Sequence, residues 1–355
     1  ESLQKKIDEI PNTIKAIMEM IQSRENLEDK ICADLDEGIK LFGRPRVCKI
    51  VGQDSIKTKP LPFRVLITQS NVKKMMTGSS LVGMVQDEVI GYYPEVTEED
   101  TLLVFNDSGR AYNLDLTKLA ISDAGQKGYS LLDTIGMGGN ALLSILIKPK
   151  ELKKAEKYNV AMFTQRGIIK STPLSEFIKC RSDIQGIVLD DGDKVCYATV
   201  LDSKKDMKRL VYTKKGMGIV VDLATVAVTS RMTKGAVHLS FGSDEICGVC
   251  KADTDRMAIF TTKGYAKITG LDDILTAKKR KADMVRLMSL VDGDDIFKIV
   301  PVNDDFHKAK IVVYMATGGK LELTENDLRE TTRISKGYKT IPVKRGDSIV
   351  RIRLV

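Results

Sequence analysis

The sequence contains no tryptophan, and phenylalanine and tyrosine together bring the aromatic content to only 5%. Proteins that bind single-stranded nucleic acid without sequence preference stack successive bases on aromatic side chains. So few aromatic residues disfavour a stacking platform of that kind. Long apolar runs are also missing, because none approaches the roughly 20 residues that a membrane-spanning helix needs. We expect no membrane contact, and no signal peptide is recognisable at the start.

Cysteine is present, but its spacing does not indicate a disulfide framework. The six residues are irregularly placed in a chain of 355, which indicates a reducing compartment and a cytoplasmic protein; they are Cys32, Cys48, Cys180, Cys196, Cys247 and Cys250. Cys247 and Cys250 form a single C-x-x-C in an expected strand, where a separation of three directs the two thiols to opposite faces. We therefore expect no metal site.

Because the chain begins at Glu1 rather than methionine, we expect a fragment or a processed product.

Six short apolar segments each run into a tight polar turn and leave it as a second apolar segment. The residues in the glycine place of these turns are Asn71, Gly109, Gly167, Gly216, Gly264 and Gly319, separated by 38, 58, 49, 48 and 55 residues. Glycine and asparagine tolerate the positive φ that such a turn demands. Intervals of this size are typical of propeller blades or solenoid units.

A second pattern follows the turn in four of the repeats, where two apolar segments flank a Gly-Asp or Gly-x-Asp turn. These segments span residues 186–196, 237–246, 287–296 and 339–349. Two hairpins in each repeat provide four strands, the content of one blade. The sequence thus predicts a mainly β protein with about six blades, although the second hairpins of the first two repeats cannot be placed.

The first 43 residues predict helices. Ile7, Ile10, Ile14, Ile17 and Ile21 recur at spacings of three and four, and a second apolar stripe follows the expected N-cap Ser23. Pro11 predicts a kink or a restart within the first stripe. This segment has six Lys and Arg against ten Asp and Glu, a net charge of −4. The whole chain carries +8, which leaves +12 on the repeats.

A basic β array favours a polyanion as its partner, and the basic residues recur at equivalent places. If the blades surround an axis, these places form a belt that suits the phosphates of a curved duplex rather than base reading. The candidate DNA-contacting residues are Lys73, Lys74, Lys127, Arg166, Lys170, Lys215, Arg231, Lys234, Lys263, Lys267, Lys278, Lys279, Arg280, Lys281, Arg333 and Lys336. Three of the loops end in Lys-Gly, at residues 127–128, 234–235 and 336–337.

The segment Phe163-Thr-Gln-Arg-Gly-Ile-Ile-Lys-Ser-Thr-Pro-Leu-Ser-Glu-Phe177 resembles the repeated signature of a known family. That family is the A subunit of bacterial type IIA DNA topoisomerases, gyrase A and its topoisomerase IV counterpart. The helical start through Lys40-Leu-Phe-Gly-Arg-Pro-Arg46 is similar to the segment that leads out of the coiled-coil gate of the family. The resemblance covers nearly the whole chain and is weakest over residues 50–150.

The resemblance implies a six-bladed β-pinwheel with strands exchanged between blades, which binds and bends duplex DNA on a basic rim. It places the end of the tower and gate at residues 1–46 and the pinwheel at residues 47–355. The implied partners are double-stranded DNA, a second copy of the full-length A subunit, and the topoisomerase B subunit, in a nucleoid-associated enzyme. Magnesium and ATP belong to the intact enzyme with its B subunit, so no cofactor is expected in this chain.

None of the ten tyrosines lies in a helical segment beside an arginine, the pairing that the cleavage nucleophile of the family needs. We therefore expect this region to bind DNA without cutting it, with no catalytic residue and no activity of its own. The gyrase box Gln-Arg-Arg-Gly-Gly-Lys-Gly is represented only by partial echoes at residues 125–128, 231–235 and 333–337. This departure favours a topoisomerase IV-like or divergent role over supercoiling, without excluding a degenerate gyrase.

Two other classes of function remain open. A propeller that scaffolds protein partners would show binding that is insensitive to salt. An enzyme with a central-channel active site would gather histidines and acids on the inner strands, and two histidines in the chain make this class the least favoured.

Overall fold

The computed structural model describes residues 2–43, 61–77, 88–122, 126–155, 157–178, 183–202, 207–235, 237–271, 274, 276–277 and 283–355. The chain divides into two compact units, Glu1–Lys59 and Pro60–Val355, which we treat separately. The domain boundary predicted at residues 46 and 47 lies outside the described residues. No described helix is both long and apolar enough to span a membrane.

The first unit contains two helices, α1 (Ser2–Gln22) and α2 (Arg24–Phe42). Ser23 caps α2 as predicted, because its hydroxyl accepts a hydrogen bond from the Asn26 amide at 3.4 Å. The predicted restart at Pro11 is wrong, since α1 continues through this residue. Proline has no backbone N–H, so α1 lacks one hydrogen bond at Pro11 but is otherwise continuous. The isoleucine stripe of α1 is 48% to 68% exposed within the chain.

The second unit consists of β-sheets with short helical connections. The strands are β1 (Phe63–Thr68), β2 (Asn71–Met76), β3 (Val89–Val96), β4 (Thr101–Asn106), β5 (Arg110–Leu114), β6 (Tyr129–Ser130), β7 (Ala141–Ile147), β8 (Tyr158–Thr164), β9 (Ile168–Pro173), β10 (Ile184–Gln185), β11 (Val195–Asp202), β12 (Lys208–Thr213), β13 (Met217–Asp222), β14 (Val237–His238), β15 (Ile246–Lys251), β16 (Arg256–Thr261), β17 (Tyr265–Gly270), β18 (Thr276–Ala277), β19 (Val285–Arg286), β20 (Ile296–Pro301), β21 (Ile311–Met315), β22 (Lys320–Leu323), β23 (Tyr338–Lys339) and β24 (Ile349–Leu354). The α-helices between them are α3 (Leu131–Ile135), α4 (Leu152–Ala155), α5 (Ser175–Ile178) and α6 (Asp304–Lys308).

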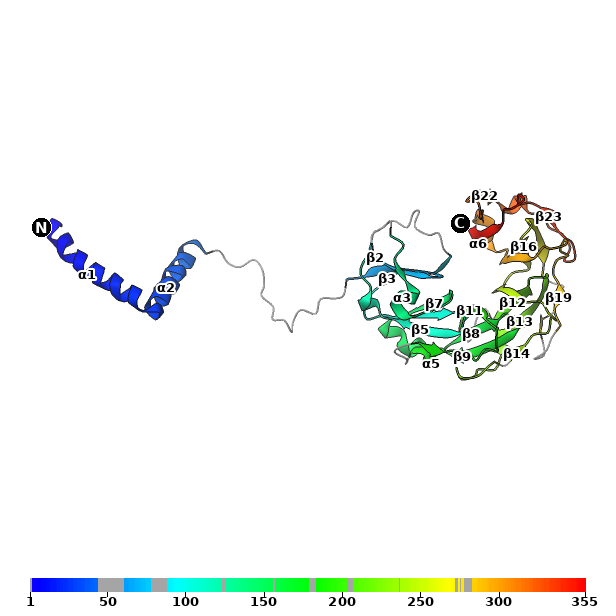
Figure 1. The fold of residues 1–355 in the computed structure, drawn as a ribbon, viewed down its shortest axis with the longest axis horizontal. Helices are drawn as coiled ribbons and strands as arrows, with labels where there is room; N and C mark the ends of the chain where they lie inside the picture. The colour runs from blue at the N-terminus through cyan, green and yellow to red at the C-terminus, as the bar shows by residue number, and fades with distance from the viewer. Residues whose placement is uncertain are drawn as a thin grey trace. The chain divides into compact units, whose positions relative to one another are not determined.

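These strands form six blades around a centre (Figure 1). In order from the centre outward, we number them blade 1 (β3-β1-β2-β6), blade 2 (β7-β4-β5-β10), blade 3 (β11-β8-β9-β14), blade 4 (β15-β12-β13-β18, with β19 also on β13), blade 5 (β20-β16-β17-β23) and blade 6 (β24-β21-β22). Among the described strands, blade 6 has three. Figure 1 shows β14, β19 and β23 at the periphery of the disc. The predicted mainly β fold with six blades is confirmed.

The predicted second hairpins are wrong in one respect, because their two arms join different sheets. In the segment 184–202, β10 pairs with β5 of blade 2 whereas β11 pairs with β8 of blade 3. The same division separates β14 from β15 and β23 from β24. In blades 1 to 5 the outermost strand therefore comes from a later repeat, which is the strand exchange that the family resemblance implies. Alternating apolar residues predict a strand but carry no information on which edge it joins.

Apolar side chains fill the spaces between successive blades. Phe105 and Phe177 meet edge to face between blades 2 and 3, with ring centroids 5.0 Å apart. Both rings are buried, and each contributes about 1.5–3 kcal/mol by leaving water. Phe177 closes the Pro-Leu-Ser-Glu-Phe signature, so the end of that motif builds the contact between two blades.

The turn glycines have the positive φ that the sequence predicts, with one correction. In the last repeat the left-handed residue is Gly318, at φ 88°, rather than Gly319. The amide of Gly318 donates to the Met315 carbonyl, as the amide of Gly167 donates to that of Thr164. The first turn is one residue shorter, since Ile67 pairs with Val72 whereas Phe163 pairs with Ile169. Asn71 accordingly begins strand β2.

Candidate nucleic-acid interface

Two of the predicted DNA-contacting lysines lie inside the blades. Lys170 on β9 and Lys267 on β17 are both 0% exposed. The ammonium of Lys170 donates to the carbonyls of Gly186 (2.9 Å), Arg231 (2.7 Å) and Thr233 (2.7 Å). A side chain that no solvent reaches cannot contact a phosphate, so the placement of these two lysines on the rim is wrong.

Lys267 repeats this arrangement in blade 5. Its ammonium donates to the carbonyls of Thr332 (3.0 Å), Arg333 (2.7 Å) and Ser335 (2.9 Å). Burial lowers the pKa of Lys170 and of Lys267 to about 8, because the charged form loses hydration. Glu176 opposes this pKa shift for Lys170, whereas Arg333 adds to it for Lys267.

The shorter first turn changes which lysine of blade 1 is equivalent. Lys73 pairs across the hairpin with Leu66, two residues before Thr68, just as Lys170 pairs with Met162, two residues before Thr164. Lys73 is 3% exposed, and its ammonium donates to the Gln126 carbonyl at 2.7 Å. Lys73, rather than Lys74, is thus the counterpart of Lys170 and Lys267, and its predicted place on the rim is also wrong.

Lys74 has a different buried environment. It is 5% exposed, lies 4.1 Å from the centroid of the Phe63 ring, and donates to the Leu116 carbonyl (3.0 Å) and to Glu98 (3.2 Å). The carboxylate and the ring face both stabilise the ammonium. The prediction that Lys74 faces DNA is wrong for the same reason of burial.

Further basic residues lie on the loops that accept hydrogen bonds from Lys73, Lys170 and Lys267. These loops lead into the outermost strands. Lys127, Lys234 and Lys336 are exposed, while Arg231 and Arg333 are partly buried. We call these five residues the outer-loop set. The structure brings them to the outer edge of blades 1, 3 and 5, before β6, β14 and β23. The outer edge is where the sequence predicts a basic rim, and contact of these residues with DNA stays a prediction.

The glycine of each Lys-Gly pair lets the loop approach the neighbouring strand. A Cβ on Gly128 would lie 2.5 Å from the Val72 carbonyl oxygen, and one on Gly337 would lie 2.7 Å from that of Ala266. Both glycines also have positive φ, 86° and 69°. Only glycine meets these two requirements without strain.

Arg166, Lys215 and Lys263 form a separate group, because they are exposed at the tips of the β8–β9, β12–β13 and β16–β17 turns. The backbone amide of each donates to an aspartate of a later Gly-Asp or Gly-x-Asp turn. These aspartates are Asp193 (3.1 Å), Asp244 (3.2 Å) and Asp294 (2.8 Å). The aspartate therefore caps the tip of the preceding hairpin, which explains why the motif recurs.

Acidic residues lie close to several of the exposed bases. Lys215 forms a 2.6 Å ion pair with Asp295, and Lys234 pairs with Asp190. Lys263 donates to the Asp292 carbonyl. Exposed ion pairs are worth about 1 kcal/mol or less, so a phosphate can displace the carboxylate. Lys278, Lys279, Arg280 and Lys281 lie outside the described residues.

Sequence reasoning missed two basic residues beside the blade 5 loop. Arg329 is exposed with its guanidinium 4.5 Å from the centroid of the Tyr338 ring, and Lys339 is exposed on β23 itself. Lys339 lies three residues after Lys336, so its position next to a Lys-Gly pair was a usable signal. The location of Arg329 at the foot of the same loop is set by the tertiary structure.

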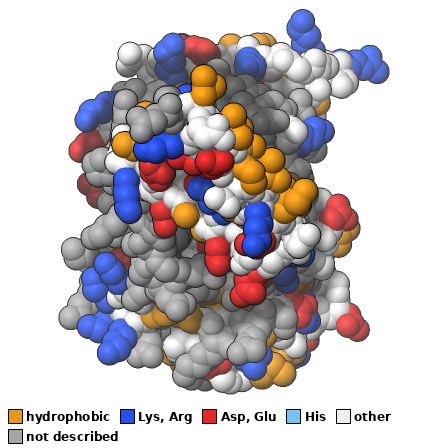
Figure 2. Space-filling view, turned by 90° about the vertical axis from the view of Figure 1, so that its left-hand side faces the viewer, with side chains coloured by type: hydrophobic (Ala, Val, Ile, Leu, Met, Phe, Trp, Pro, Cys, Tyr) orange, Lys and Arg blue, Asp and Glu red, His pale blue; other side chains and the backbone are white. Residues whose placement is uncertain are grey.

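One face of the molecule carries mixed charge rather than a uniformly basic surface (Figure 2). Figure 2 shows a face on which lysine and arginine side chains are dispersed, with acidic side chains among them. A net charge of +8 over 355 residues is consistent with this mixture. Any contact with a polyanion is therefore expected at local basic loops.

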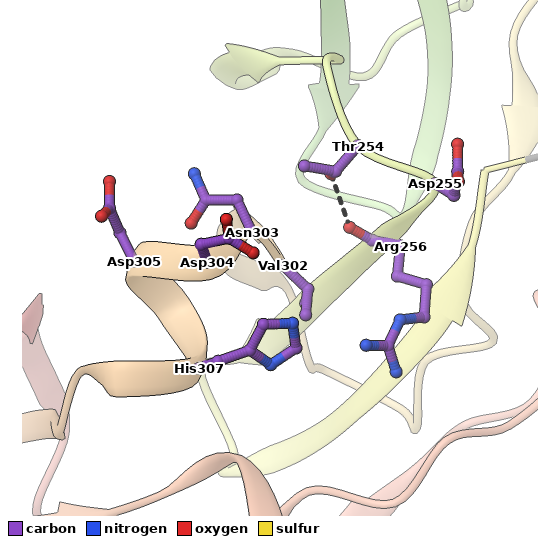
Figure 3. Close-up of a pocket in the computed structure, with 8 residues that line it drawn as sticks. All are labelled: Thr254, Asp255, Arg256, Val302, Asn303, Asp304, Asp305 and His307. Carbon is purple, nitrogen blue, oxygen red and sulfur yellow. Dashed lines mark hydrogen bonds between the residues drawn. The ribbon is translucent and has the colours of Figure 1, made fainter.

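A polar pocket of 560 Å³ lies where β16 and β20 meet α6 (Figure 3). Arg256 and His307 line it from β16 and α6, and both contact Glu325: Arg256 at 3.6 Å and His307 through a hydrogen bond. Arg256 also pairs with Glu330 at 3.2 Å. The contacts of Arg256 and His307 with Glu325 link blades 5 and 6. None of the predicted site residues lines this pocket.

The cysteines on the inner strands are embedded in backbone. Cys247 lies 3.8 Å from the carbonyl oxygens of Tyr212 and Ile296, and burial raises the pKa of Cys196 and of Cys250 to about 12. Such thiols are not nucleophiles near neutral pH. Within the described ranges, no group of three His, Cys, Asp or Glu residues could hold a metal ion.

Comparison with known proteins identifies the repeats. Residues 158–201, 210–235, 255–303 and 323–355 match the family described as DNA gyrase C-terminal domain, beta-propeller. These parts of the chain are similar to the gyrase A C-terminal region. The resemblance seen in the sequence is thereby confirmed. The matched ranges contain the hairpins of blades 3 and 5, most of the hairpin of blade 4, and the last strand of blade 6.

Comparison of the whole chain also finds gyrase A proteins. The gyrase A protein of Helicobacter pylori strain J99 is 23% identical over 359 residues, which cover 94% of this chain and 43% of the relative. The gyrase A protein of Campylobacter fetus is 22% identical, over 99% of this chain and 46% of the relative. The chain thus spans less than half the length of these relatives.

Solved structures share the fold of this chain. The C-terminal domain of DNA topoisomerase IV superposes with a TM-score of 0.73 at 17% identity, covering 84% of this chain and 94% of that domain. The C-terminal domain of DNA gyrase A has a TM-score of 0.56 at 19% identity, covering 82% and 99%.

Proposed function

We propose that the bladed unit binds and bends duplex DNA through the outer-loop set, as the C-terminal domain of a type IIA topoisomerase of the gyrase A kind. The observation that carries this proposal is the recurrence of Lys127, Lys234 and Lys336 as exposed side chains at the same structural position in blades 1, 3 and 5. Equivalent positions around a disc present their charges to one continuous partner. A duplex backbone offers phosphates along such a path.

The family relationship supports a role in the whole enzyme. In that role the unit presents DNA for ATP-dependent double-strand passage, while a second copy of the full-length protein and the B subunit supply the remaining machinery. Dependence on magnesium and ATP, together with a cytoplasmic location at the nucleoid, belongs to the same proposal. Without a full gyrase box, relaxation or decatenation is favoured over supercoiling.

Charge reversal tests the proposed surface. Arg333→Glu with Lys336→Glu is expected to weaken binding of a long duplex and to flatten its dependence on salt, by about 0.9 in log–log slope for each phosphate that is no longer bound. The measurement is duplex affinity by fluorescence anisotropy across a series of salt concentrations. Lys5→Glu with Lys6→Glu makes the same change in net charge on helix α1 and serves as the matched control.

The length of the duplex supplies a second measurement. A rim that bends DNA needs several helical turns to fill its binding sites, so affinity should rise with length and then level off. Affinity that is indifferent to both length and salt would contradict the proposal and favour a propeller that scaffolds a protein partner. An equal reduction of affinity in the helix control would show that only net charge matters.

A further inference from the structure

Each loop that carries the outer-loop set accepts hydrogen bonds from the ammonium of a buried lysine. Lys170 donates to the carbonyls of Arg231 and Thr233, and Lys267 to those of Arg333 and Ser335. The sequences 229–235 and 331–337 align residue for residue, so the same two carbonyls are bound in both blades. In blade 1, Lys73 binds the Gln126 carbonyl, the equivalent of Thr233 and Ser335.

The bonded carbonyls flank the side chains that face solvent. In blade 5 the Ser335 carbonyl directly precedes Lys336, and the Arg333 carbonyl belongs to a member of the outer-loop set. An ammonium has three N–H donors, and Lys267 uses all three on this one loop. Its position therefore determines the path of the backbone from Thr332 to Ser335.

The arrangement alternates around the disc. The positions of blades 2, 4 and 6 that match Lys267 in the strand register hold Tyr112, Ile219 and Leu321. Blade 2 holds its loop in another way, with a bidentate pair from Arg110 to Asp183 at 2.9 and 3.0 Å. A buried lysine thus occurs in the blades whose outer loop carries a Lys-Gly pair. In blades 2, 4 and 6 another residue type takes its position.

We propose that Lys73, Lys170 and Lys267 are positioning residues, which shape the outer basic loops to bind phosphates without touching DNA. This inference rests on the proposed function, since it names the residues that prepare the same surface. Removing the ammonium leaves loop carbonyls without donors and frees the backbone that presents Arg333 and Lys336. DNA affinity then falls although every exposed base remains.

A double-mutant cycle in blade 5 tests this role. We expect Lys267→Met to weaken duplex affinity about tenfold, the size of effect that removing one or two phosphate-binding charges would have. In the Arg333→Ala/Lys336→Ala background the same substitution should weaken affinity by less than about twofold further, because residues that act through one another are not additive. Equal reductions in both backgrounds would overturn the proposal.

Hydrogen exchange supplies a readout that does not depend on DNA. Lys267→Met should speed amide exchange across residues 331–337, where the Ser335 amide now donates to the Thr332 carbonyl at 3.0 Å. Lys298→Met is the matched control, because Lys298 lies on inner strand β20 and donates to a carbonyl, that of Ile352, at 3.0 Å. It removes the same charge without touching an outer loop, so exchange of this loop and duplex affinity should stay within about twofold of wild type.

The outcomes separate the two proposals. Faster loop exchange with unchanged duplex affinity would overturn the positioning role and leave the proposed function standing. Absence of duplex binding by the unaltered chain would overturn the proposed function, and exchange alone would then decide whether the lysines order the loops. If Lys267→Met fails to fold, the cycle is repeated with Lys170→Met and Arg231→Ala/Lys234→Ala; failure of both would overturn the inference, because the lysines would then hold the blades.

Discussion

At the scale of single residues, the least usual groups are the two fully buried ammonium ions of Lys170 and Lys267. Each ammonium donates its hydrogen bonds to backbone carbonyls rather than to carboxylates. Carbonyl oxygens offset part of the cost of removing a charge from water. The remaining cost is seen in the pKa of both lysines, which burial lowers to about 8.

This shift predicts how stability changes with pH. An unfolded lysine has a pKa of about 10.4, so between about pH 8 and that value the unfolded chain binds more protons than the folded chain. The free energy of unfolding therefore receives a contribution that rises with pH across this window. In Lys170→Met/Lys267→Met this contribution is absent, and the rise should be flatter.

Urea unfolding from neutral pH to about pH 10.5 measures this difference. Lys234→Met/Lys336→Met is the control, because it removes two exposed charges and leaves both buried amines in place, so the rise should persist. Parallel pH profiles for wild type and Lys170→Met/Lys267→Met would show that the buried amines titrate normally.

At the scale of elements, the Lys-Gly loops combine close backbone approach with left-handed geometry. Gly337 has both constraints, since its φ is 69° and a Cβ would lie 2.7 Å from the Ala266 carbonyl oxygen. Gly346 also has positive φ, at 81°, but a Cβ there would have no neighbour within 4 Å. Comparing Gly337 with Gly346 therefore separates the cost of positive φ from the cost of close backbone approach.

Alanine substitution at these two glycines should therefore have unequal costs. Gly346→Ala is expected to cost about 1 kcal/mol from its φ alone. Gly337→Ala should cost at least about 1 kcal/mol more, because the loop must also move away from β17. Free energies of unfolding from urea titrations measure both, and equal costs would mean that the loop moves aside without strain.

At the scale of the whole molecule, strand exchange ties each of blades 1 to 5 to a later repeat. The outermost strand of blade 5, β23, follows the β21–β22 hairpin of blade 6 in the chain, so unfolding of blade 6 removes a strand from blade 5. Ordinary repeat arrays depend only on the interfaces between neighbouring units. Here shared strands add hydrogen bonds to those interfaces and should raise cooperativity.

A core substitution near the end of the chain tests this coupling. Phe306 is 0% exposed between blades 5 and 6, and Phe306→Ala should cost about 3–5 kcal/mol. We expect the bladed unit to unfold in a single transition at lower urea, with amides of blades 3 and 5 losing protection together. Earlier unfolding of blades 5 and 6 alone would contradict the coupling.

Several features followed from local chemistry and were predictable. Helices at the start, six turns with glycine at positive φ in most of them, and a mainly β array all depend on spacing and on residues that act within a few positions. The same holds for exposed Lys127, Lys234 and Lys336, because a lysine before a turn glycine has little to pack against. Each of these depends on interactions between residues close in the chain.

The tertiary structure alone decided which strands share a sheet and which lysines reach solvent. An apolar strand pattern fits either edge of either neighbouring blade, so the exchange of β10, β14 and β23 could not be derived from it. Lys170 and Lys267 look like surface residues in the sequence, and only loops that lie 61 and 66 residues further along bury them. A turn shortened by one residue moved the same role from Lys74 to Lys73. Burial depends on distant partners, and for this reason the local pattern of charge did not determine it.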